Sequence, residues 1–155
     1  MEYYSIFMTL DKKDHSILET LKENSKLTTS QIAKKLNIPI TTIHNRIKKL
    51  ENQNIISGYT IKINHKIIGQ PILSYILITV NYTSHDGKKL RQEDIAKMIK
   101  KHSEVEEISI MAGVTDILIK VRVKDMDQLN QFIINKLRSI DGVDKTQTMM
   151  VLSEV

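Results

Sequence analysis

Polar side chains recur between positions 41 and 49 at spacings that place several of them on one face of a helix. In that setting Asn45 can make a bidentate contact with adenine, and Thr41 can touch a thymine methyl group or a phosphate. Lys48 and Lys49 suit phosphates better than bases, since phosphate contacts position a protein and base contacts specify the site. The predicted DNA-contacting residues are Thr29, Thr41, Thr42, His44, Asn45, Arg46, Lys48 and Lys49.

The same pattern has a plainer interpretation, a three-helix bundle whose polar face is only solvated. Arg46 shows both alternatives, because on a helical wheel it lies close to the buried side. It can reach a phosphate, or it can pair with a carboxylate such as Glu51 or Glu19. Spacing alone favours DNA binding only slightly over the bundle.

Other chemistry finds little support in the sequence. There is no cysteine, which excludes disulfides, thiolate metal sites and a cysteine nucleophile. A Gly-rich phosphate loop and a nucleophile elbow are both lacking. The histidines are scattered without the spacing of metal ligands, at His15, His44, His65, His85 and His102. We therefore expect no enzyme, no catalytic residues, no metal site and no cofactor.

Three helices are expected to carry the polar face, over residues 11–24, from the Thr28–Gln31 capping box to just before Pro39, and over residues 40–54. In the third, Ile43, Ile47 and Leu50 follow helical spacing and are expected to point inward. Residues 55–64 alternate apolar and polar side chains, which predicts a strand that forms a small wing beside the helices.

The second half of the chain changes its hydrophobic period. Strands are expected at residues 72–82, 105–112, 116–123 and 143–152, and helices at residues 91–102 and 126–139. The inward residues of the helices are expected to be Ile95, Met98, Ile99, Leu129, Ile133 and Leu137. This βαββαβ order predicts a ferredoxin-like domain, with two helices covering one face of a four-stranded antiparallel sheet. The fold class is therefore α+β, a winged helix-turn-helix followed by this domain.

The first strand of that sheet is apolar on both sides. Leu73, Tyr75 and Leu77 point one way, while Ile76 and Ile78 point the other. Because helices can cover only one face, we expect a second copy to cover the other and form a homodimer. The alternative is an edge strand that carries a few harmless apolar residues.

The positive charge is concentrated in the first part of the chain. Residues 1–64 carry 10 Lys/Arg against 6 Asp/Glu, whereas residues 65–155 carry 13 against 12. The predicted domains are residues 1–64, a hinge at 65–70, and residues 71–155. A basic first domain suits double-stranded DNA, although a soluble basic surface without that role would look the same. The longest apolar run, residues 71–80, is too short to span a membrane, and no signal peptide is apparent, so we expect a cytoplasmic protein.

Taken together, the residues resemble the Lrp/AsnC (feast/famine) family of regulators from about Thr9 onward. The first half carries the resemblance at Leu10, Asp11, Asp14, Ile17, Leu18, Leu21, Ile32, Ala33, Leu36, Thr42, Ile43, Arg46, Ile47, Leu50, Glu51, Ile55, Ile56, Gly58 and Tyr59. In the second half, Gly113-Val114-Thr115-Asp116 resembles the family's G-x-x-D turn. The first eight residues fall outside the resemblance, which makes Met8 a second candidate for the first residue.

The resemblance implies a transcription factor that binds promoter DNA as dimers, or as tetramers or octamers built from dimers, and responds to an amino acid or related metabolite. The effector-binding residues carried over by motif are Gly113, Thr115, Asp116, Thr148, Met149 and Met150. Asp116 suits an α-amino group, and the glycine turn offers N–H groups to an α-carboxylate. Alternatively, Gly113 only makes the turn, Asp116 only caps it, and the methionines only pack.

Two departures from the family's pattern affect the DNA-binding helix. Pro39 and Ile40 stand where members often have a small hydroxyl residue, so we expect the helix cap to come from Thr41. The polar face is also poorer in arginine than in many members. An architectural protein that coats DNA with weak sequence preference and no effector is the alternative function.

Overall fold

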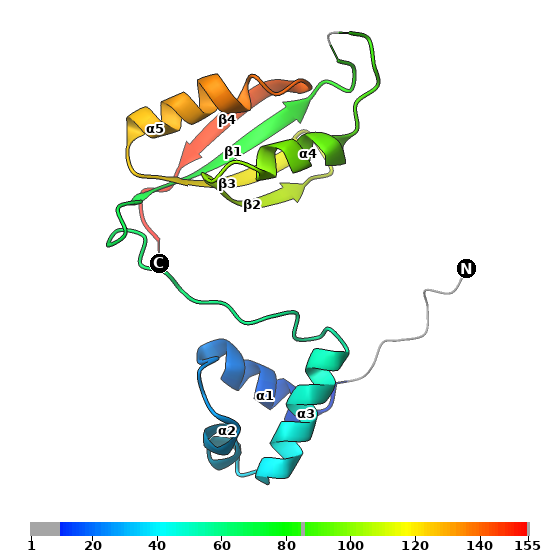
Figure 1. The fold of residues 1–155 in the computed structure, drawn as a ribbon, viewed down its shortest axis with the longest axis vertical. Helices are drawn as coiled ribbons and strands as arrows, with labels where there is room; N and C mark the ends of the chain where they lie inside the picture. The colour runs from blue at the N-terminus through cyan, green and yellow to red at the C-terminus, as the bar shows by residue number, and fades with distance from the viewer. Residues whose placement is uncertain (1–9, 85, 155) are drawn as a thin grey trace, which may run out of the picture. The chain divides into compact units, whose positions relative to one another are not determined.

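The computed structural model describes residues 10–84 and 86–154. It divides the chain into two compact units, residues 1–62 and 63–155, each of which is described by itself (Figure 1). Residues 1–9, His85 and Val155 lie outside the described residues, so the structure does not bear on Met8 as a second candidate for the first residue.

The first unit is a bundle of α1 (Lys12–Glu23), α2 (Thr29–Leu36) and α3 (Ile40–Asn52). Its buried apolar side chains among the described residues are Ile17, Leu21, Ile32, Ile43 and Leu50. Capping boxes begin the first two helices, the second at the Thr28–Gln31 spacing that the sequence predicts. The Asp11 carboxylate accepts from the backbone N–H of Asp14, and the Thr28 hydroxyl accepts from that of Gln31. Asn37 then ends α2 in the left-handed conformation, at φ +53°.

The start of α3 differs from the expectation. Pro39 occupies the N-cap position with no side-chain hydrogen bond, and Thr41 already lies inside the helix. The expected cap by Thr41 is therefore wrong. Pro39 nevertheless suits a helix start, because its ring fixes φ and its missing N–H is not needed there.

The strand expected at residues 55–64 is also wrong. No strand forms there, and the first unit has no other strand among its described residues that could pair with it. Alternation alone does not make a strand, since backbone groups need a partner ladder. Instead, the N–H groups of Ile55 and Ile56 donate to the Leu50 carbonyl, which turns the chain back toward α1.

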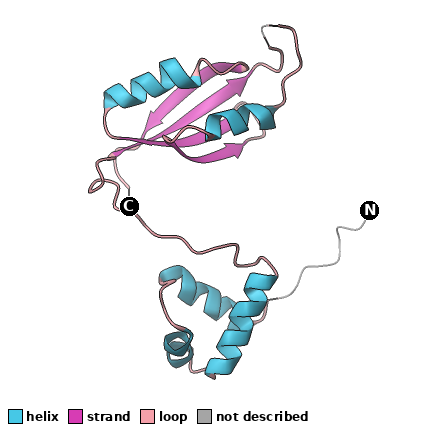
Figure 2. Ribbon diagram, in the orientation of Figure 1, coloured by secondary structure: helices cyan, strands magenta, loops and turns pink. Residues whose placement is uncertain are grey.

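The second unit confirms the βαββαβ order. It contains β1 (Ile72–Val80), α4 (Gln92–Lys100), β2 (Val105–Ile110), β3 (Ile117–Val123), α5 (Met126–Gln131) with a π-helical continuation η1 (Phe132–Leu137), and β4 (Val143–Met150). The sheet order is β2-β3-β1-β4 with antiparallel pairs throughout, and the helices lie over one of its faces (Figure 2). The core between them includes Ile76, Ile78, Ile119, Ile99 and Phe132.

One inward residue of the helices differs from the expectation. Met98 is 37% exposed and Ala96 is buried in its place. Ile133 packs against the core as expected but is only half-buried, whereas Phe132 and Leu137 are fully buried. Phe132 and Leu137 belong to the π-helical stretch, whose wider turn brings residues five apart onto one face.

The other face of the sheet combines apolar and charged side chains. Tyr75 of β1 pairs with Met149 of β4, and Leu77 pairs with Leu118 of β3. Farther along β3, Arg122 donates to Glu106 and Glu154 at 2.9–3.2 Å. The expected homodimer through this face stays a prediction.

The expected hinge at residues 65–70 forms a turn in the second unit. The Gln70 N–H donates to the His65 carbonyl at 2.8 Å, and Gly69 has φ +78°. His65 also approaches Glu106, with Nε2 and Oε1 separated by 3.4 Å. Whether this turn moves as a hinge stays a prediction.

Candidate nucleic-acid interface and effector site

The face of α3 opposite the core is polar and exposed. Ile43 and Leu50 anchor the helix from the buried side. Successive turns then present the exposed side chains of Thr41, His44, Asn45, Lys48 and Lys49 to solvent. Within residues 10–84 and 86–154, none of these five side chains makes a hydrogen bond or ion pair. Their donors and acceptors are thus free for a ligand.

The two remaining threonines of the predicted set are less accessible. Thr42 lies on the flank of α3, and Thr29 is the first residue of α2; both are half-buried. The structure describes no side-chain hydrogen bond for either of them within the chain. Both can contribute through their methyl or hydroxyl groups at the edge of the polar face.

Arg46 has a structural contact inside the first unit. Its Nη1 donates to Asp11 Oδ2 and to Asp14 Oδ1, each at 2.7 Å. Asp14 is buried, so this guanidinium connects α3 to the N-terminus of α1. The backbone N–H of Asp14 and the Arg46 guanidinium together hold the pKa of Asp11 below its usual value.

The carboxylate partners expected for Arg46 were the wrong ones. Glu19 instead accepts from Lys22 at 2.8 Å, and Glu51 accepts from the Tyr59 hydroxyl at 2.8 Å. Of the predicted DNA-contacting residues, Arg46 is therefore the one whose side chain is occupied within the chain. Its acidic partners stand 32 and 35 positions away in sequence, where helical spacing gives no signal.

The G-x-x-D turn lies between β2 and β3. Gly113 has φ +134°, a conformation that L side chains rarely adopt, and Val114 is exposed. The Asp116 carboxylate accepts from the Val80 N–H at 2.8 Å and from the Tyr82 hydroxyl at 2.7 Å. These contacts fasten the end of the turn to the end of β1.

Residues around Asp116 include two that sequence reasoning missed. The Asp116 carboxylate raises the pKa of Tyr82 by accepting its proton in a hydrogen bond. Gln92, at the start of α4, donates its amide to the Asp116 carbonyl. Neither residue has a fixed spacing from Asp116, because they come from different elements that only the folded sheet brings together.

The second group of predicted effector residues lies on β4. Thr148 pairs with Ile76 of β1, and Ile117, next to Asp116, pairs with Ile78 on the other side of β1. A whole strand therefore separates Thr148, Met149 and Met150 from the turn within one chain, or roughly 10 Å across the sheet. The alternating pleat also divides them, since Met149 points to the open face and its two neighbours to the helix face.

Other kinds of site find no support in the part of the chain that the structure describes. No cluster of three His, Asp or Glu side chains that could hold a metal occurs there. None of the described helices combines the length and apolarity that a membrane crossing requires.

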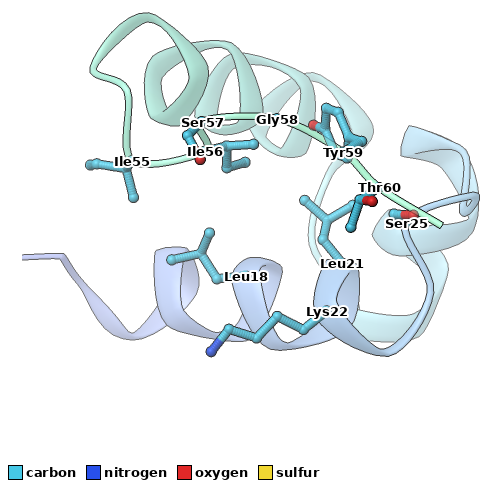
Figure 3. A pocket seen from close by; sticks show the side chains of 10 residues that line it. All are labelled: Leu18, Leu21, Lys22, Ser25, Ile55, Ile56, Ser57, Gly58, Tyr59 and Thr60. Atoms are coloured by element: carbon cyan, nitrogen blue, oxygen red, sulfur yellow. The ribbon is translucent and has the colours of Figure 1, made fainter. Parts of the chain in front are cut away.

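The first unit has an apolar pocket of about 390 Å³ between α1 and residues 55–60, drawn in Figure 3.

The first unit is a helix-turn-helix whose polar helix face makes no contact within the described chain, and a βαββαβ unit follows it. This combination is typical of DNA-binding proteins that carry a separate second domain. Residues 10–57 match the family model "Winged helix-turn-helix DNA-binding", and residues 75–155 match the "Lrp/AsnC ligand binding domain". The chain belongs to the Lrp/AsnC family of transcriptional regulators.

Individual relatives agree with this assignment. An uncharacterised HTH-type transcriptional regulator of Pyrococcus furiosus is 40% identical over 91% of both chains. The solved structure of Escherichia coli AsnC is 29% identical, with a TM-score of 0.80 over 94% of each chain. A transcriptional regulator of Neisseria meningitidis, solved as a complex with L-Met, is 27% identical, with a TM-score of 0.86 over 95% of this chain and 92% of that one. These relatives are regulators, in agreement with the expectation that the chain is not an enzyme.

Proposed function

We propose that the protein is a sequence-specific regulator that binds DNA as a homodimer through α3 and whose DNA binding or assembly responds to an amino acid. The observation that carries the DNA-binding part is the set of unpaired polar side chains on α3. Asn45 reads bases at the centre of this face, while Lys48 and Lys49 contact phosphates. A regulator of this kind works in the cytoplasm.

The effector part rests on the turn at residues 113–116. Each oxygen of the Asp116 carboxylate already accepts one hydrogen bond, and each has a second lone pair for an α-ammonium group. The N–H groups after Gly113 suit an α-carboxylate. The L-Met complex of the Neisseria meningitidis regulator supports an amino acid as the ligand class.

A complete effector site requires more than one copy of the chain. Thr148, Met149 and Met150 are separated from the turn by β1, so one copy would supply the turn and another the β4 residues. The open sheet face with Tyr75 and Leu77 is the surface through which two copies would pair. Dimers would then assemble further, into tetramers or octamers.

The test is binding of the purified protein to DNA from its own promoter, at physiological salt and with excess random DNA. Binding that survives competition supports sequence-specific recognition. Binding that disappears supports the alternative, an architectural protein driven by phosphate contacts. Repeating the assay with each common amino acid tests the effector. If none changes the affinity or the assembly state, the effector part of the proposal fails and the DNA-binding part stands.

A further inference from the structure

The segment that leaves α3 does not run freely into the second unit. After Asn54, which adopts φ +54°, the N–H groups of Ile55 and Ile56 donate to the Leu50 carbonyl at 2.9 and 3.1 Å. Ile56 packs against the core of the helical bundle. Backbone hydrogen bonds therefore fix the first two residues after the turn, and packing against the core also holds Ile56.

The next residues are held differently. Figure 3 shows residues 55–60 opposite α1, with Ile55 and Ile56 facing Leu18 and Leu21 across the cavity. A pocket of about 390 Å³ lies between residues 57–60 and α1, so this part of the segment is not closely packed against the helix. No atom lies within 4 Å of the position that a Cβ would take on Gly58, so no side-chain packing holds the segment at this residue.

One directional contact fixes this part of the segment. The Tyr59 hydroxyl donates to Glu51 Oε1 at 2.8 Å, and Glu51 lies in the last turn of α3. Partial burial of the phenol, together with the Glu51 carboxylate, raises the pKa of Tyr59 to about 12. The phenol is accordingly protonated, and able to donate, throughout the neutral pH range.

We propose that Tyr59 is a positioning residue for DNA recognition: its hydrogen bond to Glu51 fixes where the connecting segment leaves α3 and so restricts the half-site spacings that a dimer can bind. The inference rests on the proposed dimeric function. With the contact made, only residues 60–62 join Tyr59 to the second unit, which begins at Ile63. Without it the free segment starts after Ile56 and doubles to residues 57–62, so its greatest reach grows from about 10 to about 20 Å.

The consequence is a loss of spacing selectivity rather than of affinity for a half-site. Effective concentration falls with roughly the −3/2 power of linker length, so doubling the free segment weakens simultaneous binding at the preferred spacing about threefold for each linker. A longer segment also tolerates spacings that the short one excludes. The α3 face itself is unchanged, because neither Tyr59 nor Glu51 belongs to the polar set that faces DNA.

The test uses the full-length protein and DNA carrying two half-sites about one helical turn apart, or with 2–5 base pairs inserted, as probes. We expect Tyr59→Phe and Glu51→Ala to reduce the preference for the best spacing by about three- to tenfold. Glu51→Gln, whose amide oxygen still accepts the hydrogen bond, should retain it. Ser57→Ala, which alters another residue lining the same cavity, is the matched control.

Two further measurements separate the outcomes. Tyrosinate absorbance should show one tyrosine titrating at lower pH in Glu51→Ala than in the wild type, which demonstrates the contact in solution; an unchanged titration overturns the proposal. If the wild type prefers one spacing and Tyr59→Phe prefers it equally, the positioning role is overturned while the dimeric function stands. A wild type that gains no affinity from a second half-site at any spacing contradicts the dimeric function as well.

Discussion

On α3, the exposed side chains of His44, Asn45 and Lys48 make no hydrogen bond or ion pair within the described residues, whereas Asp116 at the G-x-x-D turn already accepts from Val80 and Tyr82. The first surface has its full hydrogen-bonding capacity available to a partner. At the turn, part of the hydrogen-bonding capacity is already used within the chain to hold the turn in place. Substitutions on α3 should therefore change binding alone, while substitutions at the turn should change stability and binding together.

Among the predicted DNA-contacting residues of α3, Arg46 is the exception to this rule, and Arg46→Ala should have the largest effect. Removing the guanidinium leaves the buried Asp14 without its cation, which should cost about 2–3 kcal/mol of unfolding free energy, between the values for an unmade hydrogen bond and a broken buried ion pair. Urea unfolding, followed by NMR signals of α1 and α3, measures this. The control is Lys48→Ala, on the same helix but unpaired, which should change stability by less than about 0.5 kcal/mol.

A stable Arg46→Ala variant that has lost DNA affinity would contradict the structural role and return Arg46 to the DNA-contacting set. The loss of one contact should reduce the stability of the first unit more than that of the second. Among the described residues, its buried core contains five apolar side chains, against fourteen in the second unit. A single anchoring contact is consequently a larger share of what holds the first unit together.

Substitutions of Asp116 test whether the turn contributes to both stability and effector binding. Asp116→Ala removes the acceptor of the Val80 N–H and the Tyr82 hydroxyl, which should cost the second unit about 1–3 kcal/mol. Asp116→Asn keeps one acceptor oxygen and should be destabilised less, although it loses the charge that would bind an α-ammonium group. Calorimetry for stability and amino-acid titration for binding separate the two roles. An Ala variant as stable as the wild type would show that the turn does not depend on this carboxylate.

Asn45 and Lys48 test whether the α3 face reads sequence. Asn45→Ala should weaken binding to the cognate site by about 1–3 kcal/mol and leave binding to random DNA nearly intact. Lys48→Ala should weaken both together and lower the salt dependence by about one phosphate contact. Fluorescence anisotropy across a salt series measures both. Equal losses on the two DNAs for Asn45→Ala would exclude it from base reading.

Local patterns predicted what depends on neighbours in sequence. The Thr28–Gln31 capping box, the three helices of the first unit and the βαββαβ order all follow from spacings of a few residues, and the structure has them. The strand at residues 55–64 was wrong because a strand depends on a partner that alternation does not supply. The π-helical stretch escaped prediction because Ile133 fits ideal α-helical spacing as well as Phe132 does.

The candidate site shows the same limit. The polar face of α3 was predictable, since a helix face is a local property. The engagement of Arg46 by Asp14, and of Asp116 by Tyr82, was not, because each pair meets only through tertiary packing across more than 30 positions. The contact between Tyr59 and Glu51 spans eight positions and crosses the end of a helix, where neither the 3.6 nor the 2.0 period applies.

The pH dependence of stability should distinguish the two roles of Asp11, its ion pair with Arg46 and its N-cap of α1. We expect the change in unfolding free energy to be the smallest of the series. Because folding lowers the pKa of Asp11, its charge contributes stability above its usual value of 3.8, and this contribution is lost as the pH falls through the lower folded value. Asp11→Asn keeps an oxygen for the N-cap and removes the charge. NMR-detected urea unfolding of α1 should show the variant less stable than the wild type at pH 7 and nearly equal to it at pH 2. A difference of the same size at both pH values would assign the role of Asp11 to the cap rather than to the pairing with Arg46.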